Sequence, residues 1–234
     1  MLIGISGRAG SGKDLIARMI QHQGGTLGYD FDPSATYNHW SPWQIKKFAS
    51  KLKQIVSILT DIPVADLEKE EVKNSTLPPS WNKFDWVGKV KYESAEDVPM
   101  TVRKLLQIVG TEAMRNNVHE NVWVNALFSE YRSKESARII TLDNSLPPSE
   151  WIHGEYPKWI ITDVRFPNEA KAILDRGGIL LRVNRPGNMN LAGEHPSEIS
   201  LDDYKLFNHV IENEGTIEEL YAKVTEFLTK FKFI

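Results

Sequence analysis

The chain has 234 residues, a formal net charge of −3 and no cysteine. This length is enough for one substantial hydrophobic core and short for two catalytic domains. The absence of cysteine excludes disulfides, thiol catalysis and cysteine-ligated zinc, and it fits a reducing cytoplasm. The small net charge gives no sign of a nonspecific surface for nucleic acid or membranes, so we expect neither partner.

The N-terminal part of the chain predicts a strand, a glycine-rich loop and two helices. Residues 2–5 form a short apolar run bounded by glycine, and apolar residues at helical spacing follow from Leu15. Over residues 45–59 apolar side chains recur at the spacing of one helical face. We therefore expect a single helix there, which ends before Pro63.

The middle of the chain predicts further helices and two long excursions. One helix is expected from about Met100 and another around Val122. Residues 74–99 have no sustained helical period, which indicates a long excursion or hairpin, and residues 143–157 form a similar excursion.

The C-terminal part predicts alternating strands and helices. Strands are expected at 159–162 and 179–183, and a helix over 167–176 lies between them. Such a βαβ unit implies parallel strands. A short strand at 209–211 and a capped helix that begins after Thr216 follow. The whole pattern predicts a three-layer α/β fold that binds ligands at the carboxyl ends of its strands.

The segment Gly7-Arg-Ala-Gly-Ser-Gly-Lys-Asp14 lies between the first strand and the first helix, which is the context of a phosphate-binding P-loop. Glycines let backbone N–H groups surround phosphate oxygens, and Lys13 reaches the β- and γ-phosphates. Asp14 replaces the usual Ser or Thr, and its carboxylate also suits Mg²⁺. Alternatively, Asp14 only stabilises the helix N-terminus. The residues expected to contact the triphosphate are Gly7, Ala9, Gly10, Ser11, Gly12, Lys13 and Asp14.

A second charged motif, Thr162-Asp-Val-Arg-Phe-Pro-Asn-Glu-Ala170, begins at the last residue of a predicted strand. Asp163 stands just past that strand, where a carboxylate would face a nucleotide-bound metal through water. Arg165 follows, and Glu169 lies in the first turn of the next helix, where it would orient Arg165 or stabilise the helix end. The alternative is a surface ion pair between Arg165 and Glu169 that contributes little.

These motifs resemble the deoxynucleoside monophosphate kinases of tailed phages, within the P-loop nucleoside monophosphate kinases. The segments that carry the resemblance are residues 7–14, Arg103-Lys-Leu-Leu-Gln-Ile-Val-Gly-Thr-Glu112 with Trp123-Val-Asn125, residues 162–170 and, more weakly, residues 211–220. A P-loop that ends in Lys-Asp is common in that family. The resemblance implies a single kinase domain over 1–234, with a core at about 1–30 and 136–234, a helical acceptor-binding insertion at about 35–135, and a lid.

The resemblance also implies roles on the donor side. Lys13 and Asp14 would serve the donor phosphates and Mg²⁺, with Asp163 as the second metal-binding carboxylate. Arg165 and Glu169 would complete the catalytic site together with these residues.

On the acceptor side the resemblance implies that Arg103 and Lys104 bind the acceptor phosphate, together with Arg165. Arg103 is also expected to be a catalytic residue. Trp123 would lie by the acceptor base or sugar. Arg185, in a segment resembling the lid region, would contact the donor. From the residue pattern alone, Lys104 projects into solvent and Trp123 belongs to the core.

The implied reaction is transfer of the γ-phosphoryl group of ATP to a deoxynucleoside monophosphate, with Mg²⁺ as cofactor, in the host cytoplasm of a phage. An anionic acceptor needs no strong general base, so positioning and charge neutralisation are expected to suffice. The alternatives are a kinase for another small acceptor, such as dephospho-coenzyme A or a nucleoside, and a noncatalytic switch or ATPase. A homodimer is left open, and His195 is given no role.

Overall fold

The computed structural model describes residues 1–25, 30–39, 41–81, 99–133, 155–187 and 199–234, together with the backbone at 86–87 and 90–91. The chain divides into two compact units. The first, which we call the sheet unit, contains Met1–Phe48 and Val124–Ile234, and the second, the helical unit, contains Ala49–Trp123.

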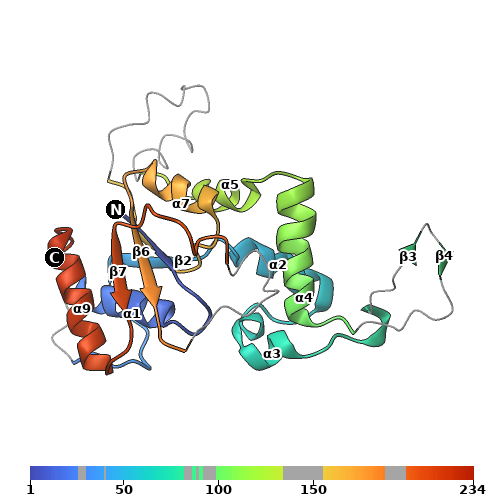
Figure 1. Ribbon diagram of the computed structural model, residues 1–234, viewed down its shortest axis with the longest axis horizontal. Helices are drawn as coiled ribbons and strands as arrows, with labels where there is room; N and C mark the ends of the chain where they lie inside the picture. Colours follow the sequence, from blue (N-terminus) through green and yellow to red (C-terminus); the bar gives the residue numbers. More distant parts are fainter. Residues whose placement is uncertain are drawn as a thin grey trace. The chain divides into compact units, whose positions relative to one another are not determined.

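The sheet unit is built on five parallel strands in the order β2-β5-β1-β6-β7. Figure 1 labels β2, β6 and β7 among them. The strands are β1 (Leu2–Ser6), β2 (Trp43–Lys46), β5 (Lys158–Ile161), β6 (Ile179–Asn184) and β7 (His209–Glu212). All five residues of β1 are buried, as expected for a central strand that is covered on both faces. The predicted parallel arrangement is therefore confirmed, and all carboxyl ends meet at one edge of the sheet.

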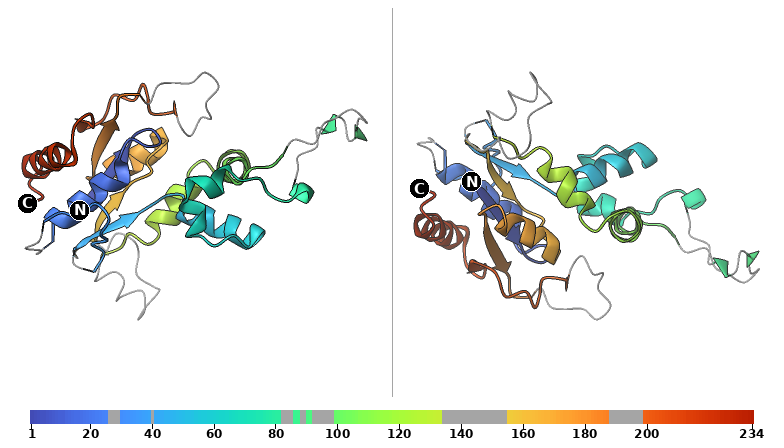
Figure 2. Two further views of the ribbon diagram at one scale, coloured as in Figure 1. Left: turned by 90° about the horizontal axis from the view of Figure 1, so that it is seen from below. Right: turned by 90° about the horizontal axis from the view of Figure 1, so that it is seen from above.

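Helices cover both faces of this sheet. On one face α1 (Lys13–Gln23) and α9 (Ile217–Lys230) lie side by side, as the views of Figure 2 show in blue and red. Their apolar side chains form one core with those of the strands, including Ile5, Ile20 and Phe227. On the other face α7 (Pro167–Leu174) packs so closely that a Cβ at Gly4 would lie 2.5 Å from Cδ1 of Ile173. These layers confirm the predicted three-layer α/β fold.

The last helix begins where its sequence predicts. Thr216 is the N-cap of α9: its side chain accepts a hydrogen bond from the Glu219 backbone N–H, and the Glu219 carboxylate accepts one from the Thr216 N–H over 2.9 Å. This reciprocal capping box satisfies two backbone donors that the helix itself leaves unpaired.

One sequence prediction is wrong. The single helix expected over 45–59 is divided, because Trp43–Lys46 form β2, in which Ile45 pairs with Ile160, and α2 (Ser50–Thr60) begins only afterwards. The buried ring of Phe48 lies in the intervening turn. A partly buried strand residue, Ile45, and a buried turn residue, Phe48, thus continue the spacing of the helix by coincidence.

The helical unit contains α2, η1 (Asp66–Glu68), α3 (Glu70–Asn74), η2 (Pro79–Trp81), α4 (Val102–Gln107) and the π-helical stretch η3 (Ile108–Arg115). Val56, Leu67 and Val102 form the centre of its own core. The backbone of Gly110 in η3 approaches α2 so closely that a Cβ there would lie 2.7 Å from Leu52. The unit therefore has a packed interior independent of the sheet.

The two predicted excursions are only partly described. Within 74–99 two short strands, β3 (Trp86–Val87) and β4 (Val90–Lys91), pair antiparallel, in agreement with a hairpin. The remainder of 82–98, residues 134–154 and the segment that contains His195 lie outside the described residues.

Among the helices that are described, none is both long and apolar enough to cross a membrane. The short helix α5 (Val122–Phe128) begins with the last two residues of the helical unit and continues into the sheet unit.

Candidate functional site

The glycine-rich segment 7–14 forms a tight loop between the end of β1 and the start of α1. Gly10 and Gly12 have φ angles of 73° and 99°, in the left-handed region that side chains disfavour. A Cβ at Gly7 would lie 2.5 Å from the backbone oxygen of Val183. The Nζ of Lys13 donates hydrogen bonds to the backbone oxygens of Gly7 and Arg8 over 2.7 and 2.6 Å. The loop therefore has the backbone conformation of a P-loop, and the side chain of its lysine contacts the loop's own backbone oxygens.

Side chains from the ends of the neighbouring strands hold this loop in place. Asn213, just after β7, donates its amide N–H to the backbone oxygen of Ser11 over 2.8 Å. Arg185, just after β6, donates to the backbone oxygen of Gly10 over 3.1 Å. The Ser11 hydroxyl is buried, and no hydrogen-bond partner lies within its reach among the described residues. A buried hydroxyl in an anion-binding loop is suited to a phosphate oxygen.

Asp14, the residue after the P-loop lysine, is held by the ends of two other strands. Its Oδ1 accepts a hydrogen bond from the Thr162 hydroxyl over 2.9 Å and forms an ion pair with Lys47 Nζ at 3.4 Å. Partial removal from water raises the pKa of the Asp14 carboxyl, but Lys47, Thr162 and Lys13 together lower that pKa below its ordinary value. Asp14 is thus kept ionised. The residue after the P-loop lysine is therefore a carboxylate that a hydroxyl from the end of β5 contacts.

Asp163 follows Thr162 at the same edge of the sheet, and its Oδ1 accepts the backbone N–H of Phe48 over 2.8 Å. The described residues contain no group of three or more His, Cys, Asp or Glu side chains that could hold a metal. Two carboxylates with hard oxygens fit Mg²⁺, because this ion usually keeps several waters and takes further oxygens from substrate phosphates. The donor set of Asp14 and Asp163 therefore suits the predicted cation.

Glu169 acts on the backbone next to Arg165. It is buried, and its Oε2 accepts the backbone N–H groups of Arg165 and Phe166 over 2.8 and 3.1 Å. These bonds cap the N-terminus of α7 and fix the chain where the Arg165 side chain emerges into solvent. Glu169 therefore stabilises the start of α7 from a buried position, whereas the Arg165 side chain is exposed.

Three predicted acceptor residues belong to the helical unit. Arg103 donates hydrogen bonds to Asn74, over 3.1 Å, and to the carboxylate of Glu70. Lys104 pairs with a glutamate at 3.4 Å, and 45% of its side chain is exposed. Trp123 is only 6% exposed, and its indole N–H donates to the backbone oxygen of Gly110 over 2.8 Å. These contacts favour the interpretation of Trp123 as a core residue.

The fold and the loop together define a P-loop nucleotide-binding protein. A family model for deoxynucleotide monophosphate kinase matches residues 44–224, which is more than half of the chain, so the chain belongs to the deoxynucleotide monophosphate kinase family. This confirms the family predicted from the motifs. The matched range begins after the P-loop.

Relatives from several viruses agree with this assignment. A relative from Acanthamoeba polyphaga mimivirus, which carries the family's name, is 33% identical over 133 residues, or 53% of this chain and 59% of that protein. The deoxynucleoside-5′-monophosphate kinase of Escherichia phage T5 is 24% identical over 268 residues, with 97% of this chain and 95% of that protein covered. The deoxynucleotide monophosphate kinase of Enterobacteria phage T4 is 27% identical over 124 residues, or 53% and 44% of the two chains. The chain thus spans about half the length of the mimivirus and T4 relatives and almost all of the T5 relative.

Proposed function

We propose that the protein transfers the γ-phosphoryl group of ATP to the 5′-phosphate of a deoxynucleoside monophosphate, giving the diphosphate and ADP. The observation that carries this proposal is the loop 7–14, in which left-handed glycines bend the backbone around the start of α1 and Lys13 crosses the opening. The phage T5 and T4 relatives are named as kinases of deoxynucleotide monophosphates, which supports this class of acceptor.

On the donor side, the backbone N–H groups of the P-loop surround the β-phosphate, and Lys13 turns from the loop carbonyls to the β- and γ-phosphates. Ser11 adds its buried hydroxyl, and Arg185 lies beside the loop where the triphosphate binds. The donor-binding residues are Gly7, Ala9, Gly10, Ser11, Gly12, Lys13, Asp14 and Arg185.

Asp14 and Asp163 are the residues that would hold Mg²⁺, which when bound neutralises charge on the β- and γ-phosphates. Thr162 orients the Asp14 carboxylate by donating a hydrogen bond to its Oδ1. Because the pKa of Asp14 lies below its ordinary value, the carboxylate is anionic throughout the neutral pH range.

On the acceptor side, Arg103 and Lys104 bind the acceptor phosphate by exchanging their glutamate partners for phosphate oxygens. Arg165 stabilises the charge of the transferring group, and Glu169 contributes by fixing the backbone from which Arg165 projects. We also keep the prediction that Trp123 lies beside the acceptor base. Its ring is buried, so little of it is exposed for contact with a base. The acceptor phosphate is itself the nucleophile, so no strongly held proton has to be removed. These residues position the acceptor and neutralise the negative charge of the phosphates.

The arrangement of the domain also remains part of the proposal. A kinase core at about 1–30 and 136–234 would carry the donor, an insertion at about 35–135 would carry the acceptor, and a closing lid would exclude water that otherwise hydrolyses ATP. We place the reaction in the host cytoplasm, with ATP and the deoxynucleotide as substrates and no nucleic-acid or membrane partner.

The proposal is tested with a panel of deoxynucleoside monophosphates incubated with ATP and Mg²⁺, in which diphosphate formation is resolved by ion-exchange chromatography. The expected result is a deoxynucleoside diphosphate from at least one acceptor and none with the Lys13→Ala variant. Phosphorylation of dephospho-coenzyme A or of a nucleoside alone would indicate a different acceptor class. ATP hydrolysis that DNA stimulates, with no phosphorylated small product, would refute kinase activity.

A further inference from the structure

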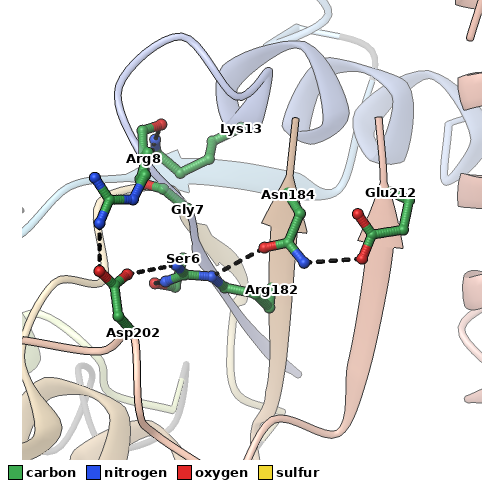
Figure 3. A network of polar contacts seen from close by, with 8 residues as sticks. All are labelled: Ser6, Gly7, Arg8, Lys13, Arg182, Asn184, Asp202 and Glu212. Atoms are coloured by element: carbon green, nitrogen blue, oxygen red, sulfur yellow. Dashed lines mark hydrogen bonds and ion pairs between the residues drawn. The ribbon is translucent and has the colours of Figure 1, made fainter. Parts of the chain in front are cut away.

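A carboxylate outside the P-loop holds two arginine side chains together (Figure 3). Oδ1 of Asp202 accepts a hydrogen bond from Arg182 over 2.8 Å, and Oδ2 accepts one from Arg8. All three side chains are mostly buried, with 13% exposed for Arg8, 14% for Arg182 and 22% for Asp202. Arg8 belongs to the P-loop and Arg182 to β6, so Asp202 connects the segment before β7 to both.

The two arginines are anchored differently. Arg182 also donates to the hydroxyl of Ser6 over 3.2 Å and to the side-chain oxygen of Asn184 over 3.3 Å. Asn184 in turn donates to Glu212 over 2.8 Å, so the contacts of Arg182 reach across β1, β6 and β7. Arg8 lies on the loop, and Figure 3 shows its side chain extending from there to Asp202. Asp202 therefore has one fixed partner and one partner on the binding loop.

Arg8 also stands beside the lysine that we assign to the donor phosphates. The backbone oxygen of Arg8 accepts a hydrogen bond from Lys13 Nζ over 2.6 Å. A guanidinium offers the same planar pair of N–H donors to a carboxylate and to a phosphate. A nucleotide phosphate carries at least as much negative charge as the Asp202 carboxylate, so it can replace that carboxylate as the partner of Arg8.

We propose that Asp202 is a counter-ion of Arg8 that the donor phosphates replace, while Arg182 retains Asp202. This inference rests on the proposed function, because it requires the donor to bind at the P-loop. Arg8 then binds the donor as a second cation beside Lys13. Binding of the nucleotide also breaks the link between residues 199–204 and the P-loop, and the measured affinity includes the free energy of breaking it.

The test uses ADP with Mg²⁺ and no acceptor, with equilibrium affinity measured by titration calorimetry. Asp202→Asn removes the charge that competes with the phosphates for Arg8, so ADP should bind at least about fivefold more tightly. A factor of about five is the lower end of typical coupling between two linked binding events. Arg8→Gln should weaken binding about tenfold, as expected for loss of a hydrogen bond between charged groups. In the double variant the gain from Asp202→Asn should vanish, because Arg8 is no longer present to be released.

Asp175→Asn is the matched control, because Asp175 forms an exposed ion pair with Lys171 at 2.6 Å and should leave ADP affinity unchanged. Hydrogen exchange of the wild-type protein adds a measurement that needs no variant: amides of 199–204 should exchange faster with ADP bound. Affinity that is unchanged or weaker in folded Asp202→Asn, or slower exchange in 199–204 with ADP, would overturn the inference and leave the donor site intact. Failure of the wild-type protein to bind ADP would overturn both the inference and the proposed function.

Discussion

Replacement of Thr162 with valine tests how Asp14 is positioned. Thr162 is 2% exposed, and valine keeps its size and branching while it removes the hydroxyl that donates to Asp14 over 2.9 Å. A hydrogen bond to a charged group contributes about 1.5–3 kcal/mol. The Asp14 side chain is 64% exposed, so we take the low end of this range. About 1.4 kcal/mol corresponds to a tenfold change in an equilibrium constant, and we expect the Mg²⁺ concentration for half-maximal rate to rise about tenfold.

The assay is the initial rate of diphosphate formation at saturating ATP and acceptor, measured over a series of free Mg²⁺ concentrations. Thr229→Val is the control, because the Thr229 hydroxyl on α9 donates only to a backbone oxygen of its own helix, over 2.9 Å. The control should keep the wild-type requirement for Mg²⁺. If folded Thr162→Val has the wild-type Mg²⁺ requirement within about twofold, the reasoning that Thr162 aims a metal-binding carboxylate is refuted.

Three further predictions concern the charges of the site and the sheet. Lys13→Ala should lower kcat at least about a hundredfold, and near-normal turnover of the folded variant would refute the P-loop assignment. Arg165→Lys should lower kcat by more than it changes the acceptor KM, whereas Arg103→Ala should mainly raise that KM; changes within about twofold for both would exclude these roles. Burial, helped by Lys230, lowers the pKa of His209 from 6.5, so the unfolded chain takes up a proton first and stability should fall as pH drops below 6.5. His209→Gln should weaken that pH dependence, measured by thermal unfolding at several pH values.

The strands and helices of the sheet unit could be predicted wherever a pattern had enough residues to be unambiguous. The run 2–5 is bounded by a glycine-rich loop, the βαβ pattern alternates apolar runs with a helical period, and the capping box after Thr216 marks the start of a helix. β2 has four residues, and one of them, Ile45, falls at the spacing of the helix that follows. Its strand structure comes from pairing with β5, which is distant in sequence and leaves no mark on the local pattern.

The candidate site was predictable where its residues form a motif and was missed where they come from separate strand ends. Lys13 and Asp14 are part of such a motif. Asn213 and Lys47 are single polar residues directly after β7 and β2, and only the order of the strands brings them to the P-loop. Thr162 begins the motif 162–170, but nothing in that motif indicates its hydrogen bond to Asp14. A useful signal is therefore the first polar residue after each apolar strand, because the carboxyl ends of parallel strands meet at one edge.

The strand order also determines when the sheet can form during synthesis on the ribosome. β1 pairs with β5 and β6, and Asn213, which holds the P-loop, lies 202 residues along the chain from Ser11. The helical unit is one continuous segment and can close its core from local contacts. β1 is apolar apart from Ser6 and is made first, yet it has no sheet partner until the segment after that unit emerges. During translation, β1 is thus the strand exposed longest to association with other chains.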